Sequence, residues 1–150
     1  MATDAPSNPL SNPVTSDFNA RSFDRPRERV APDSLVGHWW NGDDVTIELS
    51  GVTLVVAIKS NCDGCREFIG ADLGELSVPV LVVSADEDTA KEFSDARQPV
   101  FVSPEALRLL DVKWPPFYVL IDAVSRKVLT EGVLFGVAQV AAEIEPFLHD

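Results

Sequence analysis

The chain has 150 residues, 45% of them apolar, which is enough for one domain of ordinary size and rules out a second one. Its 24 acidic residues outnumber 12 Lys and Arg, and the net charge of -12 argues against a nucleic acid partner, because this surface repels a phosphate backbone. The longest apolar run, residues 52–58, is far shorter than the roughly 20 residues of a transmembrane helix.

Residues 1–33 contain five of the eleven prolines, many Ser, Asn and Asp residues, and few apolar ones. Such a composition is typical of a segment that cannot bury enough apolar surface to fold. We therefore predict a disordered tail over residues 1–33 and one folded domain over residues 34–150. Because no basic segment followed by an apolar one opens the chain, we expect a cytoplasmic protein, or an extracytoplasmic one if a signal or anchor has been removed.

Strand-type and helix-type apolar patterns alternate from residue 35 onward, which predicts an α/β domain. Residues 45–49 alternate apolar and polar side chains, as in a half-buried strand. Residues 52–58 are almost continuously apolar and β-branched, which predicts a central strand covered on both faces. Apolar residues then recur at helical spacing from Cys65 to Leu76, which predicts a helix.

The second half of the chain continues this alternation. Residues 78–83 repeat the buried-strand pattern, with Pro79 at the start, where no ladder N–H is needed. Residues 84–87 offer a capping box for a short helix that reaches about Ala96. The remaining predicted elements are a short strand at 99–102, a helix from Ser103-Pro104, a hairpin of strands 117–121 and 127–134, and a final helix over 137–148 that Pro146 kinks or ends.

Cys62 and Cys65 are the only cysteines, and they stand as C-D-G-C after the predicted central strand. The first turn of a helix has unpaired N–H groups and a partial positive charge, which favour a thiolate at Cys62. Cys65, one helical turn further on, is placed to attack a mixed disulfide formed on Cys62. The pattern therefore favours a redox pair.

Two alternative roles for this pair stay open. In the first, the two cysteines are incidental or buried residues without a chemical role. In the second, they form half of a zinc site, and His38 and His149 would be the remaining ligands. Neither histidine stands at a metal-ligand spacing, so the redox pair is the favoured interpretation. We expect no metal and no organic cofactor.

The order strand, C-x-x-C helix, strand, helix, and then a proline before a strand hairpin and a last helix resembles the thioredoxin superfamily. Residues 44–62, 84–88 and 114–122 are more similar to its TlpA-like branch, related to the AhpC/TSA proteins, which carries an extra strand before the C-x-x-C strand. The resemblance covers about residues 40–148. It implies a thioredoxin-like fold, that is, an α/β (α+β sandwich) domain with a central mixed β-sheet flanked by helices and an extra N-terminal strand.

The resemblance also implies the functional residues. Cys62 matches the attacking cysteine, Cys65 the resolving cysteine, and Pro116 the cis-proline that faces them. Trp114, Pro115 and Phe117 adjoin this proline, and we expect them to bind the substrate. The implied function is thiol-disulfide exchange with a protein disulfide substrate and an unidentified electron donor. We also expect a monomer, and the short apolar runs predict no membrane segment.

The sequence departs from the family pattern at four places. Asn61 replaces the Trp before the first cysteine, and Asp63-Gly64 replaces the common Gly-Pro or Pro-Pro. An acid beside the thiolate partly offsets the helix dipole, so the pair is expected to be reducing. Val56 stands where thioredoxins hold a buried Asp, with Lys59 and Asp63 the nearest replacements by sequence.

The fourth departure is Pro115, which precedes the expected cis-proline and has no backbone N–H to donate to a partner. With Asn61 and Val56, it supports an alternative hypothesis. The chain is then a thioredoxin-like binding or scaffold module with little or no redox turnover.

Overall fold

The computed structural model describes residues 30–148, and within this range seven strands form one mixed sheet in the order β2-β1-β5-β4-β3-β6-β7. The β3, β4 and β5 strands are parallel, and the other pairs are antiparallel. The strands are β1 (Ser34–Trp39), β2 (Asp44–Glu48), β3 (Val52–Ala57), β4 (Val80–Ser84), β5 (Val100–Val102), β6 (Phe117–Asp122) and β7 (Lys127–Val133).

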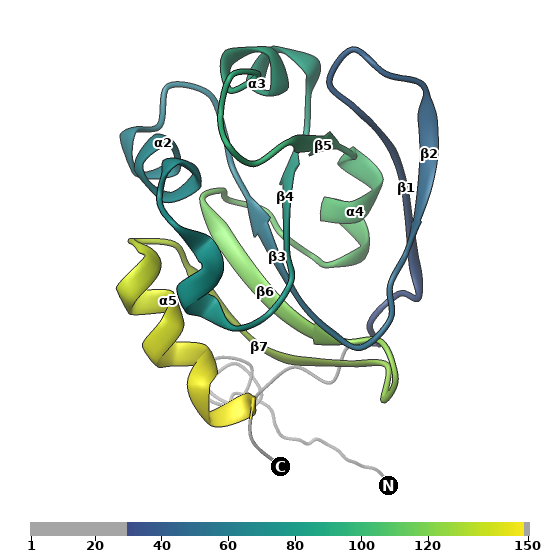
Figure 1. Ribbon diagram of the computed structural model, residues 1–150. Coiled ribbons are helices and arrows are strands. Elements are labelled where there is room, and N and C mark those ends of the chain that lie inside the picture. The colour runs from purple at the N-terminus through teal and green to yellow at the C-terminus, as the bar shows by residue number, and fades with distance from the viewer. Residues whose placement is uncertain (1–29, 149–150) are drawn as a thin grey trace, which may run out of the picture.

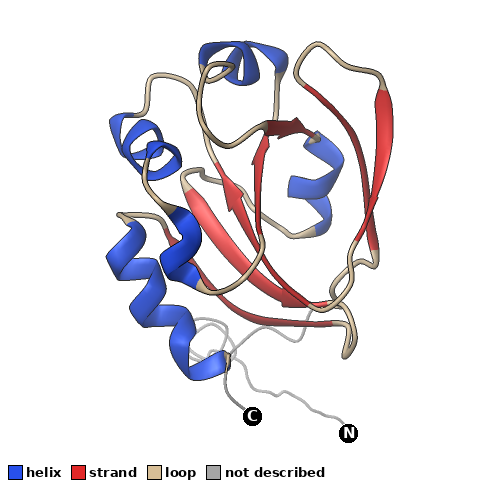
Figure 2. Cartoon of the chain, in the orientation of Figure 1, coloured by secondary structure: helices blue, strands red, loops and turns tan. Residues whose placement is uncertain are grey.

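Helices cover both faces of this sheet (Figure 1). They are α2 (Asp63–Gly70), α3 (Glu87–Glu92), α4 (Pro104–Leu109) and α5 (Val137–Ile144), with short 3-10 helices η1 (Leu73–Leu76) and η2 (Glu145–Phe147). From β2 onward the elements follow the predicted chain order, and Figure 2 shows the helices in blue and the strands in red. The expected thioredoxin-like fold is confirmed.

The central strand β3 divides the core into two clusters. Leu54, Val56 and Ile58 face a cluster built with α2, η1, α3 and α5. Val55 and Ala57 face a second cluster built with α4 and β1. Alternate side chains of a strand point to opposite faces, so a continuously apolar strand serves both clusters.

The β1 strand was not predicted, and the expected single extra strand is a hairpin of β1 and β2. The sequence of β1 does not alternate apolar and polar residues in the way that predicts a strand. Pairing with β2 on one side and β5 on the other defines it instead. A Cβ at Gly37 would overlap the carbonyl oxygen of Val102. Trp39, at the end of β1, packs against the ring of Phe101, with centroids 5.1 Å apart.

Two predicted helices have different bounds. The helix expected to run to Leu76 ends at Gly70, where Ala71 is extended, and continues as η1 after Asp72, whose carboxylate accepts the Gly74 N–H. The next helix begins after Asp86 rather than Ser84, because the Asp86 side chain caps it by accepting the Thr89 N–H at 2.8 Å. It ends at Glu92 rather than near Ala96.

The start of the described chain is attached to the domain. Val30 forms a bridge with Lys127, and the Ala31 N–H donates to the Arg126 carbonyl at 3.0 Å. Ala31 is fully buried in the second cluster. Residues 30–33 are therefore part of the folded unit, while residues 1–29 of the predicted tail lie outside the described residues.

Candidate thiol-disulfide site

The two cysteines lie where the chain leaves β3 and enters α2. Cys62 is the N-cap of α2 in an extended conformation, and its Sγ accepts the Cys65 N–H at 3.1 Å. The two Cα atoms are 5.2 Å apart, and a disulfide joins the side chains. The C-x-x-C spacing thus places the second cysteine one turn into the helix, as expected.

The two sulfur atoms have unequal access to solvent. Cys65 is fully buried in the first core cluster, while Cys62 is half-buried at the edge of that cluster. A thiol must be accessible to attack an external disulfide, whereas a resolving thiol needs only to reach its neighbour. The burial therefore suits an attacking role for Cys62 and a resolving role for Cys65.

Pro116 lies beside the C-terminal end of β3, because the next residue, Phe117, pairs with Ala57. The Pro115-Pro116 peptide bond is cis. Pro116 immediately precedes β6, in which Tyr118 belongs to the cluster that contains Cys65. The Pro116 carbonyl accepts the Leu134 N–H at 3.2 Å, which connects the proline loop to the end of β7.

The three residues expected to bind substrate differ in their surroundings. Trp114 is 79% exposed, and Pro115 is half-buried. Phe117 packs against the second core cluster, on the α4 side of the sheet. Its side chain therefore points away from the face that holds the cysteines, because the first cluster and the second lie on opposite faces of β3.

Phe135 is an aromatic residue near the proline loop that the sequence analysis did not single out. It is 76% exposed and follows Leu134, which bonds to Pro116. The Gln139 side chain holds its backbone: Oε1 accepts the N–H groups of Phe135 at 2.8 Å and Gly136 at 3.1 Å. The sequence gives little indication that Phe135 is exposed, because a Phe between a strand and an amphipathic helix is usually a core residue.

Tyr118 lies opposite Val56, the position that holds a buried Asp in thioredoxins. Its hydroxyl donates to the Glu143 carboxylate at 2.5 Å. Burial, and then this hydrogen bond, raise the pKa of Tyr118 far above its ordinary value. The ring and hydroxyl of Tyr118 lie over Gly132 of β7, so its hydroxyl is directed away from β3. Lys59 and Asp63, the nearest replacements by sequence for the missing Asp, are both exposed.

No group of three or more His, Cys, Asp and Glu side chains within residues 30–148 is arranged to hold a metal ion. His38, one of the two histidines considered as a zinc ligand, pairs with Glu87 and lies 3.9 Å from Asp44. His149 lies outside the described residues. In the same range, no helix is both long and apolar enough to cross a membrane.

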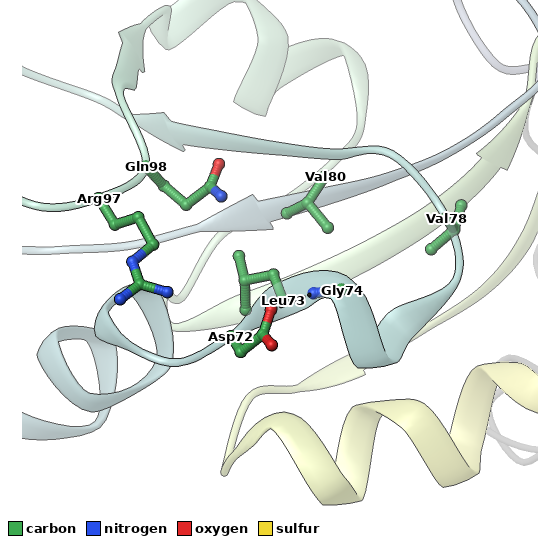
Figure 3. A pocket seen from close by; sticks show the side chains of 7 residues that line it. All are labelled: Asp72, Leu73, Gly74, Val78, Val80, Arg97 and Gln98. Atoms are coloured by element: carbon green, nitrogen blue, oxygen red, sulfur yellow. Dashed lines mark hydrogen bonds between the residues drawn. The ribbon is translucent and has the colours of Figure 1, made fainter.

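A pocket of about 240 Å³ lies between η1 and the segments that lead into β4 and β5 (Figure 3). Leu73, Val78 and Val80 contribute its apolar side chains. Asp72, Arg97 and Gln98 contribute the polar ones, and Gly74 completes the lining. Neither cysteine nor Pro116 lines this pocket, so it is separate from the candidate site.

The chain is similar to many solved structures, including the three that follow. The thioredoxin domain of a thiol-disulfide oxidoreductase from Bacteroides vulgatus has a TM-score of 0.61 at 18% identity, covering 83% of this chain and all of that one. A thioredoxin-family thiol:disulfide interchange protein from Chlorobium tepidum TLS has a TM-score of 0.60 at 19% identity, covering 83% and 99%. The dsbF protein of MTB, in mixed oxidized and reduced forms, has a TM-score of 0.59 at 10% identity, covering 77% and 98%.

No family model matches the chain, and no curated protein matches it by sequence. The similarity is therefore one of structure, and it extends over about four fifths of the chain. With the C-x-x-C pair at the start of α2 and the proline before β6, these comparisons identify the domain as one with the thioredoxin-like fold.

Proposed function

We propose that this protein is a thiol-disulfide oxidoreductase that exchanges disulfides with a protein partner through Cys62 and Cys65. The observation that carries the proposal is the unequal pair at the start of α2: Cys62 is half-buried at the N-cap and Cys65 is fully buried. The two cysteines are bonded to each other, lie at the start of a helix and have one accessible sulfur. This combination is not expected of two cysteines without a chemical role.

In the reducing direction, the Cys62 thiolate attacks one sulfur of the substrate disulfide. A mixed disulfide forms, and the first substrate sulfur leaves as a thiolate, which takes a proton from solvent. Cys65 then loses its proton and attacks the Cys62 sulfur, which releases the second substrate thiolate. The substrate gains two electrons, the Cys62–Cys65 disulfide forms, and a donor dithiol returns the pair to its reduced state.

The substrate-binding surface centres on the loop that precedes β6. This loop lies beside the end of β3 that leads to Cys62, because Phe117 pairs with Ala57. Trp114 is its exposed aromatic residue. Phe135 is equally exposed and joins this surface through the Leu134–Pro116 hydrogen bond. Phe135 takes the place that was expected of Phe117 in this surface, since Phe117 packs on the other face.

Pro115 leaves a partner's carbonyl without a backbone donor at the position where strand-like pairing is expected. Binding then depends on apolar contact with Trp114 and Phe135, which favours a narrow choice of partner. The reducing direction, a monomeric state and a cytoplasmic location remain predictions of the sequence analysis. The partner protein is defined only by its chemistry, an accessible disulfide flanked by apolar residues.

Reduction of insulin disulfides, followed as turbidity with dithiothreitol as donor, tests this proposal against the scaffold alternative. The oxidoreductase gives turnover above the dithiothreitol background, and the Cys62→Ser variant loses it. A scaffold module gives no turnover with dithiothreitol or with any other dithiol donor. Because a narrow specificity lowers the rate on insulin, a small aromatic disulfide is measured in parallel, and the absence of turnover on both contradicts the proposal.

A further inference from the structure

Glu92, at the end of α3, contacts the chain on both sides of Cys62. Its two carboxylate oxygens accept the Asn61 N–H at 3.3 and 3.2 Å. One of them also accepts from the Arg66 guanidinium at 2.9 Å. One carboxylate thus connects the residue before the attacking cysteine with the residue four positions after it.

The loop that Glu92 holds has a restricted backbone. Asn61 has a φ of 53°, in the left-handed region that Asn tolerates better than most residues. A second bond holds the same loop, because the hydroxyls of Ser60 and Thr89 are 2.9 Å apart and Thr89 is buried. The loop from β3 to Cys62 is therefore attached to α3 at two consecutive residues.

Glu92 also determines where the charge of Arg66 lies. The Arg66 guanidinium is paired with Glu92 and lies over the ring of Phe93, with its central carbon 4.9 Å from the ring centroid. Both partners belong to the segment at the end of α3, so the guanidinium is directed toward that segment. A cation near a thiolate stabilises it and a carboxylate destabilises it. Glu92 thus brings a carboxylate to the residue before Cys62 and holds the Arg66 cation at the end of α3.

The segments around Cys62 carry other charged side chains besides Glu92 and Arg66. Lys59 precedes the cysteine and Asp63 follows it, and both are exposed, with opposite charges. Lys113, on the loop that leads to Pro116, is paired with Asp111 at 2.9 Å. Among these groups, the Glu92–Arg66 pair is the one that joins α2 to another helix.

We propose that Glu92 is a positioning residue that fixes the Asn61–Cys62 loop and withholds the Arg66 charge from Cys62, so that the cysteine pair is more strongly reducing. This inference rests on the proposed function, in which Cys62 attacks the substrate. A less stable thiolate makes the dithiol form less stable relative to the disulfide. The pair therefore donates electrons more readily, in agreement with the effect expected from Asp63.

The Glu92→Gln variant of the full chain separates charge from shape, because the amide oxygen still accepts the Asn61 N–H. Two quantities are measured: the pKa of Cys62, from the pH dependence of its iodoacetamide reaction with peptide mapping, and the reduction potential, from equilibrium with glutathione. We expect the Cys62 pKa to fall by roughly half a unit to one unit. The reduction potential should rise, which means a more oxidising pair.

Two further variants provide the controls. Asp88→Asn removes an exposed acid from the same helix and should leave both quantities unchanged. Arg66→Gln removes the exposed cation and should raise the Cys62 pKa, which tests the electrostatic argument even if Glu92→Gln does not fold. A merely structural Glu92 would change the melting temperature without moving the pKa or the potential.

The inference is overturned if Glu92→Gln and Asp88→Asn match the parent protein in both quantities, or if the Cys62 pKa rises in Glu92→Gln. This result differs from failure of the proposed function. If the proposed function fails, the parent protein itself shows no turnover and no preferential alkylation of Cys62. If only the inference on Glu92 fails, the parent protein is active and the effect of Glu92 is absent.

Discussion

The Leu134 N–H donates to the Pro116 carbonyl at 3.2 Å and so joins the loop before β6 to the loop after β7. Each loop presents one strongly exposed aromatic side chain, Trp114 at 79% and Phe135 at 76%. Exposed aromatic residues near a reactive site mark surfaces where partners bind, because they bury large apolar areas on contact. This bond is the structural reason for treating both aromatics as one surface.

The Trp114→Ala and Phe135→Ala variants should each weaken binding of a protein disulfide substrate. Loss of an aromatic contact costs about 1–2 kcal/mol, which is roughly a five- to thirty-fold rise in KM. The rate with a small disulfide should change little, because it does not reach the aromatic side chains. Val124→Ala, which removes an 81% exposed side chain from the β6–β7 turn, is the matched control. An equal effect of all three variants would contradict the assigned surface.

Pro115→Thr supplies the backbone N–H that proline lacks. A hydrogen bond from this position to a partner's carbonyl contributes about 1 kcal/mol, or several-fold in affinity. We expect kcat/KM on an unrelated protein disulfide such as insulin to increase several-fold, while the rate on a small disulfide stays constant. Unchanged activity on insulin would show that the missing donor does not restrict substrate choice.

Much of the fold follows from local patterns, and the differences have physical reasons. The apolar strands β3, β4 and β6 and the Ser103 cap of α4 were predictable, because they depend on neighbouring residues. The β1 strand was not, since its identity depends on pairing with two strands and on the close approach at Gly37. Sequence patterns do not encode such long-range contacts.

The candidate site divides in the same way. The positions of Cys62 and Cys65 at the start of α2 follow from a four-residue motif, so they were predictable. The contact of Glu92 with Asn61 joins residues 31 positions apart, and a lone acid on a short helix is most often a solvated side chain. The packing of Phe117 against the second cluster was not predictable either, because the face of a side chain depends on the register of β6 with β3.

Tyr118 gives a pH-dependent prediction, and it is the only tyrosine in the chain. Burial raises its pKa above the ordinary value of 10.0, so its contribution to stability is complete below pH 10 and is lost as the pH rises toward the folded-state pKa. In an alkaline titration, the absorbance of the phenolate at 295 nm should therefore appear well above pH 10. It should appear together with the loss of the circular dichroism signal that marks unfolding. Ionisation near pH 10 in a folded protein would contradict this assignment.

The start of the domain can be tested with two deletions. Removal of residues 1–29 keeps all the contacts described for residues 30–148. Removal of residues 1–33 also deletes the buried Ala31 side chain, the Ala31–Arg126 hydrogen bond and the bond from the Leu49 N–H to the Asp33 carbonyl. We expect the second deletion to lower Tm by about 5–10 °C relative to the first. Equal Tm values would show that residues 30–33 do not stabilise the domain.

Capture of a mixed disulfide tests the exchange mechanism most directly. The reduced Cys65→Ser and Cys62→Ser variants are each mixed with a peptide that contains an aromatic-flanked disulfide, and the adducts are mapped by mass spectrometry under non-reducing conditions. If Cys62 attacks and Cys65 resolves, Cys65→Ser accumulates a peptide adduct on Cys62, Cys62→Ser remains unmodified, and the parent protein releases reduced peptide with its own disulfide formed. Equal adducts on both variants, or an adduct on Cys65 alone, would contradict this mechanism.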